Sequence, residues 1–381
     1  MIPCQRSQFD IPSDVAYLNC AYMSPLMNSV VRAGEEAVRS KSQPWGTTSQ
    51  DFFTQSEHAR TLFGELIGSS ADGVAIVPSA SYGIATAANN LPLDAGQEIL
   101  VLEEQFPSNI YSWQRLATEK QGSVRTVSAP AKTSHGTNWT PAILDAISQR
   151  TGIVALPQCH WTDGALIDLH AVSRKAKEVG AALVLDLSQS LGAMPFNVQD
   201  IDPDFMVAPT YKWLMGPYAL GFLYAAPRWR EGKPLEEGWI VRKGSENFAG
   251  LVDYQHEYQP GARRFDMGER ANFQLMPMAG RALEQLLEWG IENIADTLRA
   301  KTTVIADRAA KMGLKTSNAD LRAPHFVGVR FPGDMPQELL QRLVDRQVHV
   351  SIRGSSMRIT PHLYNTDDDI DRLFTALDAC L

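Results

Sequence analysis

Apolar and polar positions alternate through much of the chain in a repeating order of strand and helix. Short apolar runs predict strands at Val74–Val77, Ile99–Leu102, Gly152–Leu156 and Ala181–Leu185. Segments with apolar residues at helical spacing lie between or after them, most clearly Pro141–Gln149 and Leu169–Val179. Strands that alternate with helices are typical of an α/β fold, in which a mostly parallel central sheet is flanked by helices.

The segment before the first of these strands has a different pattern. Residues 1–15 are expected to form an N-terminal arm, and VAYLNCAYMSPL predicts a short strand that runs into a turn. Helical spacing then predicts one helix over Asn28–Gln43 and a second over TQSEHARTLFGELIG, with Ser56 as a candidate N-cap.

The pattern changes again after Tyr224. Residues 227–264 are rich in charge, glycine and aromatic residues, which indicates a long irregular connection. Helices are expected over Gln274–Trp289 and from there to Met312, followed by HFVGVRF, HVSIRG and MRITPHLY between helices Pro336–Arg346 and Asp367–Ala379. We therefore expect an arm (1–15), a large domain (16–265) and a smaller C-terminal α+β domain with an antiparallel sheet (266–381).

Composition narrows the classes of function. The chain has 381 residues, of which 44% are hydrophobic and 20% charged, as expected of a globular protein long enough for two domains. A net charge of −8 without a basic stripe argues against nucleic acid as a partner, and no stretch approaches a membrane span. The four cysteines show neither a CxxC pair nor metal-ligand spacing, so we expect reduced thiols, no metal site and a cytoplasmic location. The absence of GxGxxG and GxxxxGKS/T motifs weighs against a dinucleotide or nucleoside-triphosphate enzyme.

Candidate binding residues gather where the predicted strands end. Ligands of a mostly parallel sheet bind beyond the carboxyl ends of its strands, and the positions there are Ser79–Ser81, Phe106, His160–Asp163, Asp186 and Gln189. The Ser79-Ala80-Ser81 turn enters a small-residue helix, so its backbone N–H groups and hydroxyls could bind an anion. On this segment alone, a serine that only caps the helix is the favoured alternative.

Two residues indicate a particular cofactor. Asp186 ends an apolar run, and Lys212 lies in the aromatic, glycine-containing loop of APTYKWLMGPYALGFLY. Pyridoxal phosphate needs a lysine to hold its aldehyde as a Schiff base and an acid to keep its ring nitrogen protonated, so that the ring can act as an electron sink. Each residue alone is more often structural or solvated, so the hypothesis depends on the rest of the chain.

Further stretches support this hypothesis across nearly the whole chain: YLNCAYMSPL, VPSASYGIATAANNL, EEQFPSNIYSW, VLDLSQSLGAMP, GARRFDMGE and MRITPHLYNTDDDIDRL. Together with the Lys212 loop they resemble the class V aminotransferase family of fold-type I pyridoxal-phosphate enzymes, in its branch of kynureninases, cysteine desulfurases and isopenicillin N epimerases. The resemblance implies the fold of that family, pyridoxal 5′-phosphate as cofactor, a small-molecule amino acid substrate and a homodimer.

The resemblance also assigns roles around the cofactor ring. Lys212 is implied as the Schiff-base lysine and, after transaldimination, as the base that moves the substrate α-proton, which requires a lowered pKa. Asp186 would pair with the pyridinium nitrogen, and Gln189 would hydrogen-bond the ring 3′-oxygen. Phe106 resembles the aromatic residue that stacks on the ring in kynureninases, and Asn109 takes the position of the aspartate in their FPSD motif.

Other residues are implied to bind the phosphate and the substrate. Ala80 and Ser81, with the Tyr211 hydroxyl, would bind the phosphate. Arg358 matches the arginine that binds the substrate carboxylate in the desulfurases, a contact suited to a bidentate guanidinium. Asn19 and Trp239 are further candidate substrate contacts.

Each assignment has a less specific alternative. Phe106 could be a core residue, Tyr211 an interface residue and Arg358 half of a surface ion pair. His160 is a candidate substrate contact next to Trp161, but both depart from the asparagine-containing pattern of the family.

Two departures bear on the reaction. Cysteine desulfurases need a nucleophilic cysteine on a mobile loop before the carboxylate-binding arginine, whereas this chain has SIRGSSMRI there. Relatives present a threonine or asparagine to the neighbouring subunit's phosphate, but this chain has Glu269. A carboxylate repels a phosphate dianion, so either Arg270 compensates its charge or this segment faces the substrate.

The leading hypothesis is a class V aminotransferase that forms an external aldimine with a small amino acid, removes its α-proton and transaminates it. A kynureninase-like lyase, a selenocysteine or cysteine-sulfinate lyase and an epimerase are alternatives of the same class. A regulatory protein that binds pyridoxal phosphate without catalysis, and a small-ligand binder of similar α/β layout, are alternatives of another class.

Overall fold

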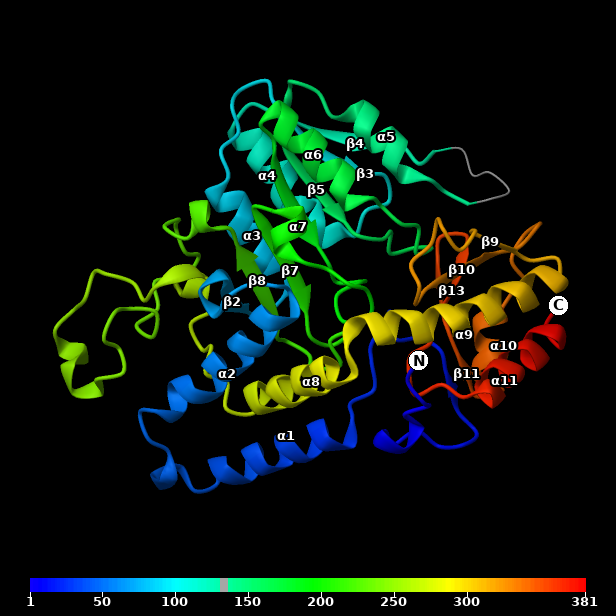
Figure 1. Ribbon diagram of the computed structural model, residues 1–381, viewed down its shortest axis with the longest axis horizontal. Coiled ribbons are helices and arrows are strands. Elements are labelled where there is room, and N and C mark those ends of the chain that lie inside the picture. The colour runs from blue at the N-terminus through cyan, green and yellow to red at the C-terminus, as the bar shows by residue number, and fades with distance from the viewer. Residues whose placement is uncertain (131–135) are drawn as a thin grey trace.

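The computed structural model describes residues 1–130 and 136–381, and a seven-stranded sheet lies at its centre (Figure 1). The strands are β2 (Val74–Val77), β3 (Glu98–Leu102), β4 (Ser123–Val127), β5 (Thr151–Pro157), β6 (Ala182–Asp186), β7 (Phe205–Pro209) and β8 (Gly221–Ala225). Their order is β2-β8-β7-β6-β5-β3-β4, and β8 alone runs antiparallel to its neighbours. The predicted α/β fold with a mostly parallel sheet is confirmed.

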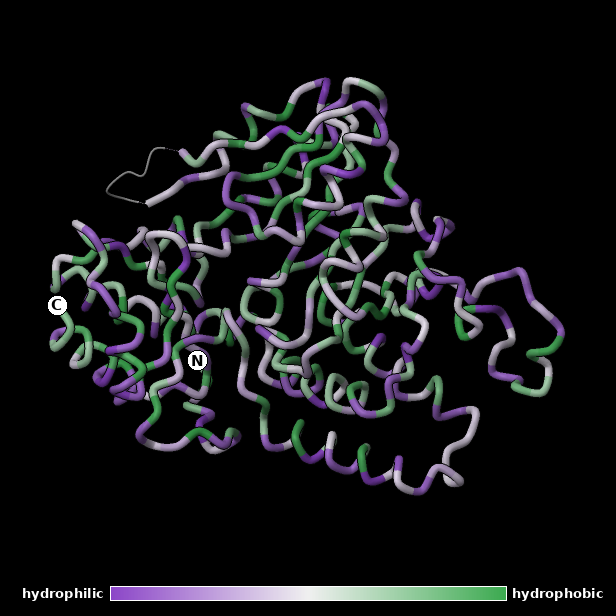
Figure 2. The backbone as a smooth tube through the Cα atoms, turned by 180° about the vertical axis from the view of Figure 1, so that it is seen from behind, coloured by the Kyte–Doolittle hydropathy of each residue, from purple (hydrophilic) through white to green (hydrophobic). Residues whose placement is uncertain are grey.

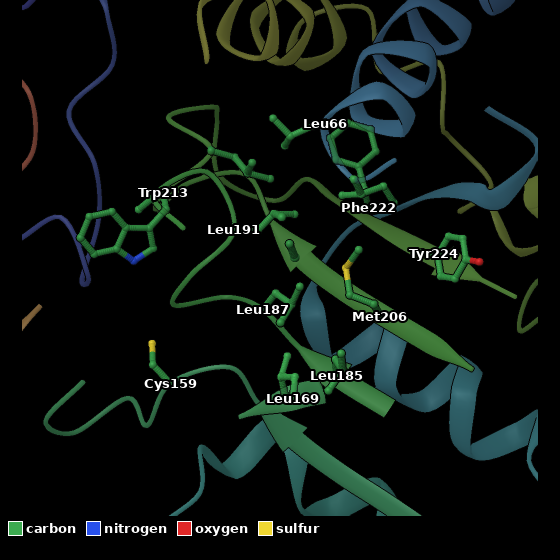
Figure 3. Close-up of a cluster of buried hydrophobic side chains, with 14 of the residues drawn as sticks. Leu66, Cys159, Leu169, Leu185, Leu187, Leu191, Met206, Trp213, Phe222 and Tyr224 are labelled. Atoms are coloured by element: carbon green, nitrogen blue, oxygen red, sulfur yellow. The ribbon is translucent and has the colours of Figure 1, made fainter. Parts of the chain in front are cut away.

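Helices cover both faces of this sheet because the strands are apolar on both sides. Leu100 and Leu102 belong to the core under one face, whereas Ile99 and Val101 belong to the core under the other, as the period of two in a strand requires. Figure 3 shows part of the first core, with Leu185 and Met206 from neighbouring strands. In Figure 2 hydrophobic positions concentrate in the central strands and hydrophilic ones along the outer segments.

The helices of the large unit are α1 (Asn28–Lys41), α2 (Asp51–Leu66), α3 (Ala80–Asn90), α4 (Tyr111–Glu119), α5 (Trp139–Ala146), α6 (Leu169–Val179), α7 (Val198–Ile201) and α8 (Leu275–Trp289). The second helix begins five residues before the expected N-cap, because Gln50 is the N-cap and Ser56 lies inside the helix. Ser56 is buried and its hydroxyl donates to the Phe53 carbonyl, so the N-cap prediction was wrong.

A smaller unit forms at the C-terminal end of the chain. Its elements are α9 (Ile291–Lys311), β9 (Lys315–Thr316), β10 (Val327–Arg330), α10 (Leu339–Val344), β11 (Val348–His349), β12 (Ser351–Arg353), β13 (Ser356–Ile359) and α11 (Asp367–Asp378). The predicted antiparallel sheet is present with the order β12-β13-β10-β9.

The start of the chain is attached to this C-terminal unit. Strand β1 (Ala16–Tyr17) pairs in parallel with β11, and the Gln5 amide donates to the Leu363 carbonyl at 2.9 Å. Helix α8, in contrast, packs on α1 and α2 of the large unit (Figure 1). The division of the chain at residues 15 and 265 stays a prediction.

The long connection after β8 contains only short 3₁₀ segments and projects from the body of the molecule (Figure 1). Its return is anchored by Asp266, whose carboxylate accepts hydrogen bonds from Arg60 at 2.7 and 3.0 Å and from the Ile76 amide at 2.7 Å. Arg60, Arg270 and Asp266 are all buried at this anchor. The anchor thus fixes the connection against the strand that leads to the Ser79–Ser81 turn. Across the described ranges, no helix has the length and apolar character required to cross a membrane.

Candidate active site

A cavity of about 300 Å³ lies at the carboxyl edge of the central sheet. Of the positions predicted from the strand ends, its lining includes Ser79, Ala80, Ser81, Phe106, His160, Trp161, Asp186 and Gln189 but not Thr162 or Asp163. It also includes Asn109, Tyr211 and Lys212, which the family resemblance implied. Because β2, β3, β5, β6 and β7 all point the same way, the loops that follow them meet at this edge.

Asp186 is the last residue of β6 and is 7% exposed. The Ser188 amide donates to its Oδ1 at 3.0 Å, and the Ser188 hydroxyl donates to the same oxygen. Within residues 1–130 and 136–381 no hydrogen bond reaches the other oxygen, Oδ2. The carboxylate is therefore oriented through one oxygen, with the second left for a ligand.

Lys212 lies in the turn between β7 and β8 and is also 7% exposed. Its Nζ lies 5.6 Å from the Phe106 ring centroid and 5.4 Å from that of Tyr211. Burial lowers the pKa of Lys212 to about 8; the Asp186 charge opposes this shift, and Arg358 and Arg353 add to it. A lysine with such a pKa is a base and nucleophile near neutral pH.

The turn between β2 and α3 forms the other end of the cavity. The Ser79 side chain accepts from the Tyr82 amide at 3.2 Å, so the helix-capping role is present. The Ser79 and Ser81 hydroxyls lie 2.8 Å apart, and both residues line the cavity with Ala80. The cap and an anion site are thus compatible, because Ser79 accepts only from the Tyr82 N–H and the first N–H groups of a helix have no partner within it.

An aromatic wall closes one side of the cavity. Phe106 meets Trp161 edge to face with ring centroids 5.3 Å apart, and the Trp161 indole donates to the Glu104 carbonyl at 2.6 Å. Phe106 is 40% exposed, so it is not the core residue of the alternative interpretation. His160 is buried, with its ring 5.1 Å from Trp139 and hydrogen-bonding distance to Thr162 and the Glu103 carbonyl. His160 thus lines the cavity while its ring is held by the protein.

Two predicted amide residues are fixed by neighbours behind the cavity. Gln189 donates to the Ala21 carbonyl at 3.1 Å and accepts from the Trp213 indole at 3.2 Å. Asn109 accepts from the Trp113 indole at 2.8 Å. His325 contacts the Gln189 carbonyl at 2.6 Å, and burial lowers the pKa of its ring to about 4.

Arg358 lies in the small unit, outside the cavity lining, and contacts Trp161, which lines the cavity. It is 1% exposed, its Nε donates to the Ser351 hydroxyl at 2.9 Å, and its Nη1 donates to the Trp161 carbonyl at 3.0 Å. Burial, with a smaller effect of Arg353, lowers its pKa to about 9. The guanidinium is therefore buried beside the aromatic wall rather than in a surface ion pair.

This packing depends on close approach of two backbones. The loop with Trp161 lies so near β10 that a Cβ on Gly328 would meet the Asp163 Cα at 2.7 Å. Glycine at this position lets the small unit hold Arg358 next to the cavity.

Three residues discussed for the site lie elsewhere. Trp239 is 38% exposed on the projecting connection, where it packs with Phe52 and Phe248, so the structure of the single chain does not bring it to the cavity. Asn19 is buried outside the cavity lining, with its amide 3.5 Å from the Val350 carbonyl. Glu269 is exposed, and its role stays open.

The idea that Arg270 compensates Glu269 was wrong. Arg270 points inward, with its Nη1 2.8 Å from Glu57 and its Nε 3.2 Å from Asp266. The charge of Arg270 is therefore used in the buried anchor.

Residues missed from the sequence are Ser188, Tyr218, Trp213 and Arg353. Ser188 belongs to the pattern around Asp186 that suggested the cofactor, and Tyr218 stands in the lysine loop, so both lay in recognised segments but were given no role. Trp213 and Arg353 act through contacts between distant segments, which no local pattern shows.

Comparison with known proteins gives a consistent result. A family model described as "Aminotransferase class-V" matches residues 16–373. The "Uncharacterized aminotransferase YcbU" of Bacillus subtilis is 27% identical over 85% of this chain and 84% of its own length. Isopenicillin N epimerase of Streptomyces clavuligerus is 25% identical over 84% of this chain and 83% of its own. The solved structure of a lysine-to-alanine mutant of C-DES, with glycine covalently linked to the PLP cofactor, covers 98% of both chains with a TM-score of 0.89 at 16% identity.

Proposed function

The chain belongs to the class V aminotransferase family of pyridoxal-phosphate-dependent enzymes, and on this premise we propose that it transaminates a small amino acid by moving the substrate's α-proton. The observation that carries the proposal is the buried Lys212, with a pKa lowered to about 8, in one cavity with Asp186. The predicted family and cofactor are confirmed by the comparisons, whereas the reaction and the residue roles are proposals.

The cavity fits the cofactor in its chemistry. The unpaired Oδ2 of Asp186 offers an anion for the ring nitrogen, and Lys212 offers an amine for the aldehyde. Ala80 and Ser81 at the start of α3 offer donors for the phosphate, with the helix N-terminus favouring its charge. Phe106 would lie along the ring. When bound, pyridoxal phosphate accepts the electron pair left by the departing α-proton.

Lys212 is suited to move that proton. With a pKa of about 8, roughly a tenth of its amines are unprotonated at pH 7, against roughly one in three thousand at the ordinary value of 10.5. Arg358 would hold the substrate carboxylate, because its Nη2 makes no hydrogen bond within the described residues. Arg358 would thus hold the substrate carboxylate while Lys212 acts on the proton of the neighbouring α-carbon.

The hairpin before Arg358 supports transamination over desulfuration. Only Gly354 and Ser355 separate β12 from β13, and neither they nor the flanking strands contain a cysteine. No mobile loop can therefore deliver a thiol to the substrate from this position.

The proposal is tested by incubating the holoenzyme with a panel of amino acids, with and without a keto-acid acceptor. Turnover that requires the acceptor is expected, and it should disappear in Lys212→Ala together with the absorbance near 410–430 nm, roughly the band of the lysine-bound cofactor. Release of ammonia, sulfide or alanine without an acceptor would reject transamination in favour of a lyase. Cofactor binding without turnover of any amino acid would favour the regulatory alternative.

We also propose a homodimer in the cytoplasm. Trp239 on the projecting connection could then approach the partner's site, since it does not approach its own. Light scattering of the holoenzyme should give the mass of two chains, and a stable monomer would contradict this.

A further inference from the structure

The hairpin of β12 and β13 places two arginines and two serines on one face. Ser351 pairs with Arg358 and Arg353 pairs with Ser356 in the strand register. Side chains alternate along each strand, so these four lie on the same side of the sheet. The residues between them, Ile352 and Met357, face the core of the small unit instead.

This polar face lies against Trp161, a residue of the cavity lining. The guanidinium carbons of Arg353 and Arg358 each lie 5.9 Å from the Trp161 ring centroid, and Trp161 lines the cavity. The two cations therefore flank one indole at the wall of the site.

Both positive charges lack an anionic partner. Arg358 donates to the Ser351 hydroxyl and the Trp161 carbonyl, and Arg353 donates to the Ile352 carbonyl at 2.7 Å. All these acceptors are neutral, and across the described ranges neither guanidinium lies within 4.0 Å of a carboxylate. Arg358 is buried without a counter-charge, which is costly, and the nearby charge of the half-buried Arg353 adds to that cost. A compensating negative charge is therefore expected from a ligand.

The cofactor does not supply this charge in the proposed arrangement. Among the described cavity-lining residues Asp186 is the one carboxylate, and it is assigned to the ring nitrogen. The phosphate is assigned to the start of α3. One α-carboxylate of a substrate satisfies Arg358, which leaves the charge of Arg353.

We propose that the substrate of this site is an amino acid whose side chain carries a second acidic group, a carboxylate or a sulfinate, bound by Arg353. The proposal rests on the proposed function for its amino-acid substrate. Arg353 is half-buried beside Trp161 of the cavity wall, so its guanidinium can meet the side chain of a substrate whose α-carboxylate is held by Arg358. A planar guanidinium suits either acid through paired hydrogen bonds.

The first test measures binding to the holoenzyme without any chemistry. Succinate and butyrate have the same chain length but carry two and one carboxylates, and calorimetric titration compares their dissociation constants. Succinate is expected to bind about tenfold to a hundredfold more tightly than butyrate, because one additional charge-assisted hydrogen bond contributes roughly that difference in affinity. In Arg353→Gln this preference should fall to about one, whereas Arg353→Lys should keep part of it.

A matched control is Arg346→Gln, which removes the same charge from an exposed position at the end of α10. It should leave the preference unchanged. Equal binding of succinate and butyrate to the unaltered enzyme would overturn the proposal even if Arg353→Gln did not fold. An equal loss for both ligands in Arg353→Gln would overturn it too, because both arginines would then hold the same carboxylate.

The second test compares turnover of aspartate, glutamate and cysteine sulfinate with that of asparagine and glutamine. The acids should have the higher kcat/KM, and Arg353→Gln should raise KM for the acids with little change for the amides. Preferred turnover of the amides would overturn the inference while leaving the proposed function intact. Selective binding of succinate without turnover of any amino acid would support the acidic subsite and reject the proposed function.

Discussion

Replacing Lys212 by methionine should stabilise the cofactor-free protein. Methionine has a similar length and an unbranched apolar chain, so it can fill the same space between the Phe106 and Tyr211 rings. It removes a positive charge that the fold buries with Arg358 as a neighbouring cation. The change therefore relieves a cost that the protein carries for function.

The size of this cost follows from the pKa of Lys212. A folded value of about 8 against the ordinary 10.5 corresponds to roughly 3 kcal/mol, at about 1.4 kcal/mol for each factor of ten. Burial is the largest cause, and the Asp186 charge already offsets part of it. Loss of the two ring contacts to the charged amine costs about 1 kcal/mol. We therefore expect Lys212→Met to raise the free energy of unfolding by about 2–3 kcal/mol at pH 7.

The gain should depend on pH in a defined direction. Below pH 8 the lysine is protonated in both states, and the cost of charging it in the fold is fully present. Between pH 8 and 10.5 the native state has already lost its proton while the unfolded state retains it, so the unaltered protein gains stability as pH rises. The advantage of Lys212→Met should therefore shrink to about 1 kcal/mol at pH 10.

Urea unfolding of the two cofactor-free proteins at pH 7 and pH 10 measures this directly, with equal m-values as the check on comparability. Lys233→Met makes the same chemical change at an exposed position and should alter stability at neither pH by more than about 0.5 kcal/mol. The reasoning fails if Lys212→Met is no more stable than the unaltered protein at pH 7. It also fails if the gain is the same at both pH values.

Three further predictions concern cofactor attachment, phosphate binding and the buried anchor at Asp266. Absorbance can follow the rate at which the cofactor-free protein forms its covalent bond with pyridoxal phosphate. This rate should rise with pH until Lys212 is deprotonated near pH 8 and then level off. A flat profile would contradict a titrating lysine. Ser81→Ala should weaken cofactor affinity in equilibrium dialysis by about tenfold to a hundredfold, whereas Ser123→Ala, at an exposed position, should not. Equal affinity of Ser81→Ala and the unaltered protein would remove Ser81 from the proposed phosphate site. Asp266→Asn should cost about 3–5 kcal/mol of unfolding free energy, because it removes the buried negative charge that Arg60 and Arg270 share and leaves them Glu57 alone. A loss below about 1 kcal/mol would mean that the anchor rearranges.

The cavity residues assigned to the cofactor could be predicted because each follows a strand that the local sequence pattern marks. Each strand is marked by a short apolar run, and each functional residue follows its strand by a few positions, as Ser81 follows β2 and Asp186 ends β6. The parallel arrangement then brings the loops to one edge without further information. This is why unrelated positions along the chain were correctly expected to share one cavity.

The remainder of the site depends on contacts that no local pattern encodes. Trp239 had the right chemistry for a substrate contact but lies on a connection whose path the sequence does not specify. Ser56 was a candidate N-cap because serine often caps helices, yet the helix begins at Asp51 and includes the buried Phe53 before it. Arg353 lies beside Trp161 only because a two-residue turn folds β12 back on β13.

The proposed roles divide the determinants of cofactor and substrate between the two units. Lys212, Asp186 and Ser81 come from the central sheet, whereas Arg353 and Arg358 come from a hairpin of the small unit. Contact between them passes through the Trp161 loop, where Gly328 allows the backbones to approach. A substitution in the hairpin can therefore change which amino acid is bound without altering the residues assigned to the cofactor. On this proposal the same cofactor residues can serve different substrates, because the two arginines proposed to select the substrate belong to a separate part of the fold.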